Sequence, residues 1–231
     1  MNFEDKLISG VFIKRYKRFL VDVKIKNKLI TAHCPNTGSM QGLLRKGNKV
    51  WLSESNNPNR KLKYTLQIIE DNGSKVGINT HLTNKIVLNA LKDDRIKEVG
   101  KNINIKSEVK FGDNTRFDFL ISKKNYKAFI EVKNVTLSRK ARIAEFPDAV
   151  TSRGAKHINE LLKASNKGYD IYIVFIIQRE DCNKFTIASD IDPEYSKLLS
   201  IAVKKKLKIL CYDCKFSSKG IKLNKKIKFR I

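Results

Sequence analysis

The chain has 231 residues, enough for one large domain or two small ones with buried cores. Hydrophobic residues make up 41% of it, which excludes disorder over most of its length. The 48 lysines and arginines outnumber the 23 acidic residues and give a net charge of +25, which is typical of a protein that binds nucleic acid. A genome-wide bias towards lysine is a plainer explanation of this charge, and both explanations stay open.

No segment of the sequence has the composition of a membrane anchor or a secretion signal. The longest apolar run, Ile171–Ile177, has the length of a strand. The four cysteines form no dense disulfide framework, so we expect reduced thiols, a cytoplasmic location and no membrane partner. They are Cys34, Cys182, Cys211 and Cys214, and the lone CxxC pair at the end of this series is weak evidence for zinc.

Residues 1–80 are predicted to be rich in β-strands. Short segments of strand-forming residues are separated there by clusters of Gly, Asn and Pro. The expected strands are Val11–Arg15, Phe19–Ile25, Leu29–His33, Lys49–Ser53 and Lys63–Ile69. Several short strands without a helix between them favour a small barrel, and an OB-type barrel is the first candidate in a basic protein.

Residues 81–231 are predicted to form a second domain of mixed α/β class. Its first helix is expected over Lys85–Lys92, with Thr83 or Asn84 as the cap. The later elements are strands at Ile105–Phe111, Arg116–Ser122 and Tyr126–Val135, a helix near Thr151–Ala164, a strand at Tyr169–Ile177, a helix near Pro193–Lys205, a strand at Lys208–Tyr212 and an edge hairpin or strand within Lys219–Ile231.

Three polar residues stand in two neighbouring predicted strands that are otherwise apolar. Asp118 lies between Phe117 and Phe119, so strand alternation predicts that it faces away from both rings. Glu131 and Lys133 share one face of the next strand, with their Cα atoms about 6–7 Å apart. If the two strands form a hairpin, Asp118, Glu131 and Lys133 converge.

These residue types suit phosphodiester hydrolysis. The carboxylates of Asp118 and Glu131 can bind a hard cation such as Mg²⁺, which polarises a phosphate and lowers the pKa of bound water. The ammonium of Lys133 can orient that water or offset charge in the transition state. The plainer alternative is a surface ion pair, because Glu-x-Lys also occurs at Glu4 and Glu108 in this lysine-rich chain. Only Glu131 follows a strand that carries an acid inside an apolar run.

Two further groups of residues are candidate contacts for nucleic acid. On the predicted helix near residues 151–164, one stripe holds Arg153, Lys156, His157 and Glu160. The two cations suit phosphate contacts, and His157 suits a phosphate contact or a position behind the site. In the barrel, cations alternate with aromatic residues and a polar turn follows, which gives the candidates Arg15, Lys17, Arg18, Asn36, Thr37 and Ser39. A solvated basic surface is the alternative for each group.

In several segments, which include the residues described above, the chain resembles the sugar fermentation stimulation protein A family of prokaryotes. The matching segments run in order over nearly the whole chain and are Arg15–Leu20, His33–Met40, Ser107–Gly112, Arg116–Phe119, Ile130–Leu137 and Phe146–His157. The resemblance implies an N-terminal OB-fold joined to a nuclease domain of the PD-(D/E)XK type. Asp118, Glu131 and Lys133 match that motif, although Arg116-Phe117 replaces its leading proline.

The resemblance also implies a function and its requirements. We expect Mg²⁺ or Mn²⁺ as cofactor, with Glu108 as an additional acid on the metal side, and DNA as the partner, with RNA as a second one. A homodimer stays open. The rival hypothesis is a non-catalytic DNA-binding regulator of sugar catabolism genes, against which the lack of a helix-turn-helix signature counts. A basic protein of ribosomal type is a third alternative, and the two well-patterned domains weigh against it.

Overall fold

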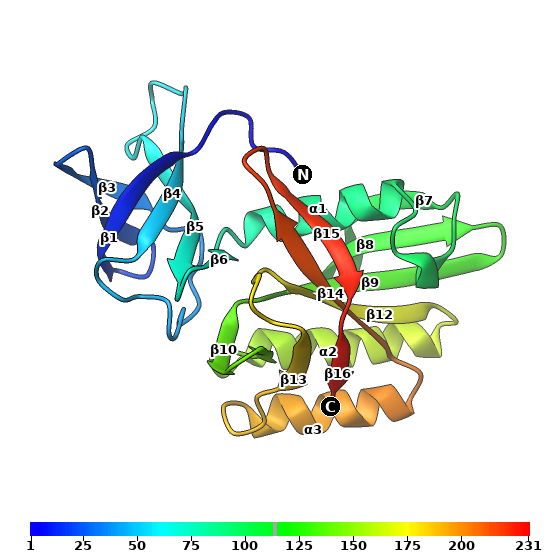
Figure 1. The fold of residues 1–231 in the computed structure, drawn as a ribbon. Coiled ribbons are helices and arrows are strands. Elements are labelled where there is room, and N and C mark those ends of the chain that lie inside the picture. The colour runs from blue at the N-terminus through cyan, green and yellow to red at the C-terminus, as the bar shows by residue number, and fades with distance from the viewer. Residues whose placement is uncertain (113–114) are drawn as a thin grey trace.

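The N-terminal strands close into a small barrel (Figure 1). The computed structural model describes residues 1–112 and 115–231. The barrel strands are β1 (Ile8–Tyr16), β2 (Leu20–Ile25), β3 (Lys28–His33), β4 (Lys49–Glu54), β5 (Tyr64–Asp71) and β6 (Ser74–Gly77). They follow the order β3-β2-β1-β4-β5-β6, and a pairing of β3 with β5 closes the barrel. Buried side chains such as Phe12, Val23 and Leu66 fill its interior, so the expected OB-like barrel is confirmed.

The rest of the chain builds a six-stranded mixed sheet with helices on both faces (Figure 1). The strands β15-β14-β12-β9-β8-β7 lie side by side in this order, with β9, β12 and β14 parallel to one another. Their bounds are β7 (Asn104–Phe111), β8 (Thr115–Lys123), β9 (Tyr126–Val135), β12 (Asp170–Ile177), β14 (Lys208–Phe216) and β15 (Ile221–Lys226). The helices are α1 (His81–Lys92), α2 (Ser152–Asn166) and α3 (Pro193–Lys204), with a 3₁₀ turn at Lys97–Val99. The mixed α/β class is confirmed.

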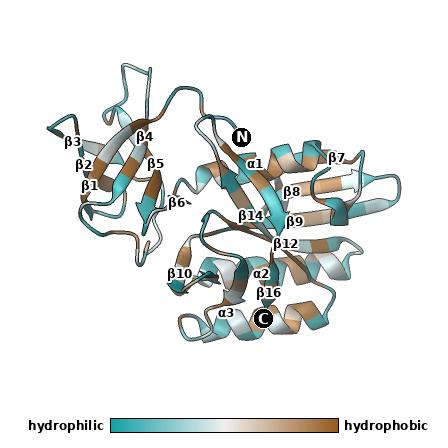
Figure 2. Ribbon diagram, viewed as in Figure 1, coloured by the Kyte–Doolittle hydropathy of each residue, from teal (hydrophilic) through white to brown (hydrophobic). Residues whose placement is uncertain are grey.

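The central strand β12 explains how both faces of the sheet are packed. Its residues from Ile171 to Ile177 are all buried, as expected for a strand covered by helices on both sides. Ile173 and Phe175 pack towards α2 and α3, whereas Tyr172 and Val174 pack towards α1. The hydrophobic colouring in Figure 2 follows the strands and the inner helix faces accordingly.

A second, small sheet was not predicted from the sequence. It has the order β10-β11-β13-β16 and is built from β10 (Leu137–Lys140), β11 (Ile143–Phe146), β13 (Lys184–Ile187) and β16 (Lys228–Arg230). Each of these strands has only three or four residues, which is too short for an alternating pattern to stand out. The sheet brings the chain around Asp148 back to the barrel, where the Asp148 backbone carbonyl accepts a hydrogen bond from Ser39 Oγ at 2.8 Å.

Buried polar contacts join the barrel to the α/β unit. The Arg179 guanidinium, 3% exposed, contacts Asp71 Oδ2 of β5 at 2.9 Å and Asp181 Oδ2 at 2.7 Å. It also donates to the backbone carbonyl of Thr136 at 2.9 Å. These contacts leave the buried guanidinium well paired, as a buried charge requires. No helix of the described residues is long and apolar enough to cross a membrane.

The first helix begins earlier than the sequence predicted. Its N-cap is Thr80, which makes no side-chain capping bond, so neither Thr83 nor Asn84 is the cap. Both side chains point inward instead, because Thr83 contacts Asn134 of β9 at 3.2 Å and Asn84 contacts the sheet at Asp118. Thr83 and Asn84, whose residue types are common at the start of a helix, therefore contact the sheet instead of capping the helix.

Candidate active site

Asp118 lies at the point where β8 and β9 separate. The pairs between the two strands run from Lys123–Tyr126 to Phe119–Ile130, and β9 then continues to Val135 beside β12. The Asp118 carboxylate accepts the backbone N–H of Val132 at 2.7 Å through Oδ2. The carboxylate thereby accepts from a backbone N–H of β9 at the fork, the point where β8 and β9 separate. The same hydrogen bond fixes the position of the Asp118 side chain.

The strand is irregular at Asp118, which corrects one prediction. Phe117 packs in the cluster towards α2 and Phe119 in the cluster towards α1, so the two rings do not share a face. On the neighbouring β7, Glu108 has a φ of 54°, and the pairs on either side of it keep their register. Simple alternation therefore fails at this point of both strands, and on β7 the backbone leaves the extended conformation at Glu108.

Glu131 is the buried acid at the centre of the site, with 3% of its surface exposed. Its Oε1 contacts Lys133 Nζ at 2.8 Å and also the Nδ1 of His157 on α2. Its Oε2 is buried and has no hydrogen-bond partner among the described residues. Burial alone would raise the pKa of Glu131, but the charge of Lys133 and the hydrogen bond from His157 outweigh it and hold the pKa below its usual value.

Asp118 has the opposite electrostatic setting. Burial, followed by the charge of Glu131, raises the pKa of Asp118 to about 6. Hydrogen bonds from the Val132 N–H and from Asn84 Nδ2, the latter at 2.7 Å to Oδ1, offset part of this rise. Neighbouring carboxyl groups whose pKa values are shifted in opposite directions are common in functional sites.

The donor set fits a hard cation. A carboxylate oxygen that is buried and unpaired, on Glu131, lies beside the carboxylate of Asp118, whose pKa burial and the charge of Glu131 raise to about 6. Such oxygen ligands are those that Mg²⁺ and Mn²⁺ prefer. Within residues 1–112 and 115–231 no group of three or more His, Cys, Asp or Glu side chains has metal-binding geometry. Water would therefore fill the other ligand positions, as is usual for Mg²⁺.

Glu108 of β7 lies opposite Asp118 of β8, but it contacts none of the other described residues of the site. Its neighbours Ser107 and Val109 pair with Phe119 and Phe117. The Glu108 side chain is exposed and makes no hydrogen bond or ion pair with any described residue. Its assignment as a further metal-side acid stays a prediction.

One residue of α2, His157, was expected on a basic stripe with Arg153 and Lys156, either as a phosphate contact or in a position behind the site. His157 is 7% exposed and faces Glu131, so it lies behind the site and not on the exposed stripe. The buried stripe of α2 runs through Gly154, His157 and Ile158, which the helical period of 3.6 residues brings onto one side. His157 is therefore a partner of the acid, while Arg153 and Lys156 are exposed beside it.

The barrel residues that were predicted to contact nucleic acid fall into two groups. Some hold a loop of the barrel in place, and the others are exposed. Arg15 donates to the backbone carbonyls of Asn36, Gly38 and Ser39 at 2.8, 3.0 and 3.3 Å, and to that of Arg18 at 2.8 Å. Its guanidinium thus holds a loop instead of being free for a phosphate. Asn36 is buried, and its Oδ1 accepts the Gly38 N–H at 2.8 Å. The loop is therefore a fixed structure.

The remaining predicted barrel contacts are accessible. Lys17, Arg18 and Thr37 are exposed, and the first two form the turn between β1 and β2 with φ values of 49° and 63°. Ser39 is exposed as well, but its hydroxyl donates to the backbone carbonyl of Asp148. The loop and turn lie together, because the Cys34 N–H bonds the Phe19 carbonyl.

Two residues of the site were missed in the sequence. Asn84 holds Asp118, and it was interpreted as a helix cap because Asn is common at that position. Tyr195 of α3 is fully buried, and its hydroxyl has no partner among the described residues. Burial and the charge of Glu131 raise the pKa of Tyr195 above its ordinary value. Only tertiary packing brings Tyr195 near the acid.

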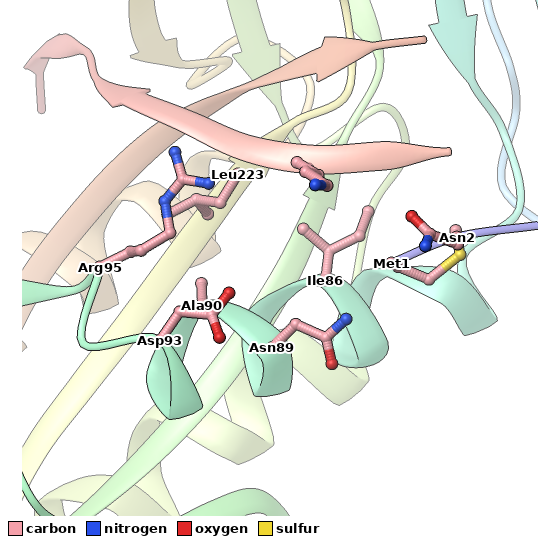
Figure 3. A pocket seen from close by; sticks show the side chains of 9 residues that line it. Met1, Asn2, Ile86, Asn89, Ala90, Asp93, Arg95 and Leu223 are labelled. Atoms are coloured by element: carbon pink, nitrogen blue, oxygen red, sulfur yellow. The ribbon is translucent and has the colours of Figure 1, made fainter. Parts of the chain in front are cut away.

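Another cavity, of about 200 Å³, lies on the α1 face of the molecule and holds none of these residues (Figure 3). Asn89 of α1 and Asp93, the residue that caps the end of this helix, lie along it, with Arg95 opposite, and Met1 closes one end. The CxxC pair of β14 forms no shared site either, because Cys211 packs towards α2 and α3 and Cys214 towards α1. The acidic pair is thus the best candidate for chemistry.

Comparisons with known proteins match both halves of the chain. The model of the sugar fermentation stimulation protein RE domain matches residues 81–220, and that of the SfsA N-terminal OB domain matches residues 13–78. A sugar fermentation stimulation protein homolog of Pelagibacter ubique is 53% identical over 228 residues, covering 99% of this chain and 98% of that one. The Rhodospirillum centenum homolog is 42% identical, covering 99% of each chain. The solved structure of Pyrococcus furiosus SfsA in complex with Ca²⁺ is 27% identical and has a TM-score of 0.90, covering 100% of this chain and 98% of that one.

Proposed function

The chain belongs to the sugar fermentation stimulation protein family, and we propose that it is a divalent-metal-dependent nuclease that hydrolyses phosphodiester bonds of DNA. The observation that carries this proposal is the Glu131 carboxylate, which is buried with one oxygen unpaired beside Asp118 and in contact with Lys133. A buried acid without a full set of partners costs stability, so a functional reason for keeping it is expected.

Each residue of the site has a role in this proposal. Asp118 and Glu131 would hold Mg²⁺ or Mn²⁺, which when bound supplies Lewis-acid polarisation of the phosphate. Lys133 orients the attacking water and offsets negative charge in the transition state. Asn84 fixes Asp118, and His157 fixes Glu131, so that neither carboxylate has to reorganise during the reaction.

The Pyrococcus furiosus relative supports the metal requirement, because it was solved in complex with Ca²⁺, a hard cation that also prefers oxygen ligands. The basic surface supports a polyanionic substrate. Exposed cations lie on both units, namely Lys17 and Arg18 on the barrel and Arg153 and Lys156 on α2. DNA would be held by these residues and the OB-like barrel, with RNA as a second substrate.

The test is cleavage of DNA and RNA by the purified chain with Mg²⁺, with Mn²⁺ and with chelator. Lys133→Ala is expected to lower the rate by about 100-fold or more, the usual effect of losing a group that stabilises transition-state charge. Lys127→Ala, an exposed lysine on the same strand, is the matched control and should keep its rate. Equal cleavage by wild type and Lys133→Ala would show a contaminating nuclease and end the assignment.

The second candidate function is a non-catalytic DNA-binding regulator of sugar catabolism genes. The contacts of Glu131 with Lys133 and His157 favour it, because they partly satisfy the acid without any cation. This candidate predicts a DNA footprint that persists in chelator. It also predicts that Asp118→Ala has no effect in cells, whereas the nuclease proposal predicts loss of function.

A further inference from the structure

A small cavity lies at the seam between the barrel and the α/β unit. Its volume is about 120 Å³, and Asn36 of the barrel loop and Asn134 of β9 line it from opposite units. Thr80, Phe146 and Asp148 also line it. The space equals about four liquid waters at ~30 Å³ each, which admits a flat ring but is smaller than the ~300–1,000 Å³ of a pocket for a drug-sized ligand.

The amide groups of this cavity are fixed in orientation. Asn36 Oδ1 accepts the Gly38 N–H at 2.8 Å. Asn134 Oδ1 accepts from Gln178 Nε2 at 2.6 Å and from Thr83 Oγ1 at 3.2 Å. The Nδ2 groups of Asn36 and Asn134 make no hydrogen bond with any described residue, so each leaves donors for a ligand.

The cavity also offers a fixed acceptor. Asp148 Oδ2 accepts from Ser39 Oγ and from the Met40 N–H, both at 3.2 Å, whereas Oδ1 has no hydrogen-bond partner among residues 1–112 and 115–231. The other carboxylate of the lining, Glu145, is saturated by Arg139 through both oxygens. A free carboxylate oxygen beside two amide donors disfavours a phosphate and matches a ring whose edge carries both donors and acceptors.

An aromatic ring completes the lining. Phe146 is half-buried, and its ring lies 5.4 Å from the rings of both Phe175 and Tyr195. This packing holds the ring in place as a surface for stacking. Nucleobases combine a π-face that stacks on aromatic side chains with an edge of donors and acceptors.

The position of the cavity relates it to the proposed reaction. Asn134 follows Glu131 by three residues on β9, which is about 10 Å along a strand, and its side chain faces α1 whereas that of Glu131 faces α2. That distance spans about three nucleotides of a stacked strand at 3.4 Å each, and fewer of an extended one. On the other side, Asn36 belongs to the loop next to the exposed Lys17 and Arg18 turn.

We propose that this cavity receives one unpaired base of a nucleic acid strand that crosses the seam towards Glu131, with preference for bases that carry an amino group. The Asp148 carboxylate accepts from that amino group, and the Asn36 and Asn134 amides donate to ring or carbonyl acceptors. The proposal rests on the proposed function for its substrate class, and it adds a base preference that phosphate contacts alone do not give.

The test measures binding without cleavage. The full chain in chelator is titrated against labelled single-stranded dT 12-mers, either uniform or with one central dA, dC or dG, and affinity is read from fluorescence anisotropy. Wild type is expected to bind the oligonucleotides with an amino base at least threefold tighter than uniform dT. In Asp148→Asn, the amide oxygen takes the place of Oδ2 and keeps the Ser39 and Met40 contacts, while the NH2 group replaces the free acceptor with a donor. The ratio should then fall to about one.

Matched variants separate base contact from general charge. Asp93→Asn removes the same charge at the far end of α1 and should keep the threefold ratio. Asn36→Asp should lose it, whereas Gln41→Glu makes the same chemical change at an exposed position of the same loop and should keep it.

Equal affinity of wild type for all four oligonucleotides would overturn the base cavity and leave the nuclease proposal standing. A ratio unchanged in Asp148→Asn would overturn it as well. Conversely, a base preference lost in Asp148→Asn, without metal-dependent cleavage in the nuclease assay, would support the cavity while the nuclease proposal fails.

Discussion

At the scale of one residue, Asp118 shows that holding a buried carboxylate in the site lowers the stability of the metal-free fold. Its carboxyl is held by Val132 and Asn84, yet burial and Glu131 raise its pKa from 3.8 to about 6. Because the folded pKa lies above the unfolded one, the stability from the protonated group is fully present below pH 4 and is lost as the pH rises through 6. At pH 8 the ionised group therefore destabilises the metal-free fold.

Replacing this acid by its amide should remove that cost. In chelator at pH 8, we expect Asp118→Asn to raise the free energy of unfolding by about 3 kcal/mol, because the pKa of Asp118 rises from 3.8 to about 6 and each pKa unit corresponds to ~1.4 kcal/mol. The gain should shrink towards pH 5 and vanish below pH 4. The Asn84 amide can turn to accept from the new amide group. Urea denaturation at each pH measures the effect.

Asp5→Asn is the control for this experiment, since Asp5 is exposed and makes no hydrogen bond with a described residue. Its unfolding free energy should change by less than about 0.5 kcal/mol, as is usual for surface substitutions. Adding Mg²⁺ should stabilise wild type and not Asp118→Asn, because a ligand stabilises only the state that binds it. A variant no more stable than wild type at pH 8 contradicts the raised pKa.

Some residues of the site can be predicted from the sequence, and others cannot. Glu131 and Lys133 were predicted to share a face because a strand has period two, and their side chains meet at 2.8 Å. His157 and Asn84 come from helices. Periodicity tells which residues of a helix lie on one side, but not which part of the sheet that side contacts, so these partners had to come from the structure.

At the scale of elements, long periodic segments were predictable and short ones were not. The strand expected at Tyr126–Val135 has those same bounds in the structure. The strands of the small sheet escaped notice, since three or four residues carry too little pattern. The start of α1 was missed by four residues, because the polar residues at its beginning serve contacts with the sheet and not capping.

The close approach of α2 and α3 depends on Gly154. A Cβ added there would lie 2.8 Å from Thr151 Cγ2 and 3.0 Å from Tyr195 Cε2. An alanine in a helix interior usually stabilises by about 0.5–1 kcal/mol relative to glycine. We expect Gly154→Ala to destabilise instead, by about 1–3 kcal/mol, because the crowded contact forces the helices apart.

Urea denaturation of Gly154→Ala compared with Ser152→Ala measures this effect. Ser152 is exposed in the same turn of α2, so its replacement changes propensity without crowding. The prediction would be wrong if Gly154→Ala were as stable as wild type. A shifted α2 should also move His157 away from Glu131 and lower the proposed activity.

At the scale of the whole molecule, the two units are joined by a buried charge. Arg179 depends on Asp71 of the barrel and on Asp181 of its own unit. Breaking a buried pair from one side typically costs about 3–5 kcal/mol, because the remaining charge is left uncompensated. We expect Asp71→Ala to approach the lower end of this range, since Asp181 still neutralises the guanidinium.

The measurement is urea denaturation together with limited proteolysis at residues 78–80 between the units. Asp71→Ala should lower the free energy of unfolding by about 3 kcal/mol and speed cleavage there. Glu54→Gln removes an accessible ion pair with Lys63 in the same barrel and should change stability by less than about 1 kcal/mol. Equal effects of both variants would show that Arg179 does not couple the units.

The fork between β8 and β9 has a consequence for self-association. A strand that loses its neighbour exposes backbone groups to which another chain can add, and such edges promote aggregation. Here the Asp118 carboxylate covers the Val132 N–H and places negative charge at that edge. We therefore expect the acid proposed for metal binding also to disfavour pairing with another chain at this point, so Asp118→Leu should aggregate on storage whereas Asp118→Asn, which keeps an acceptor, should remain dispersed.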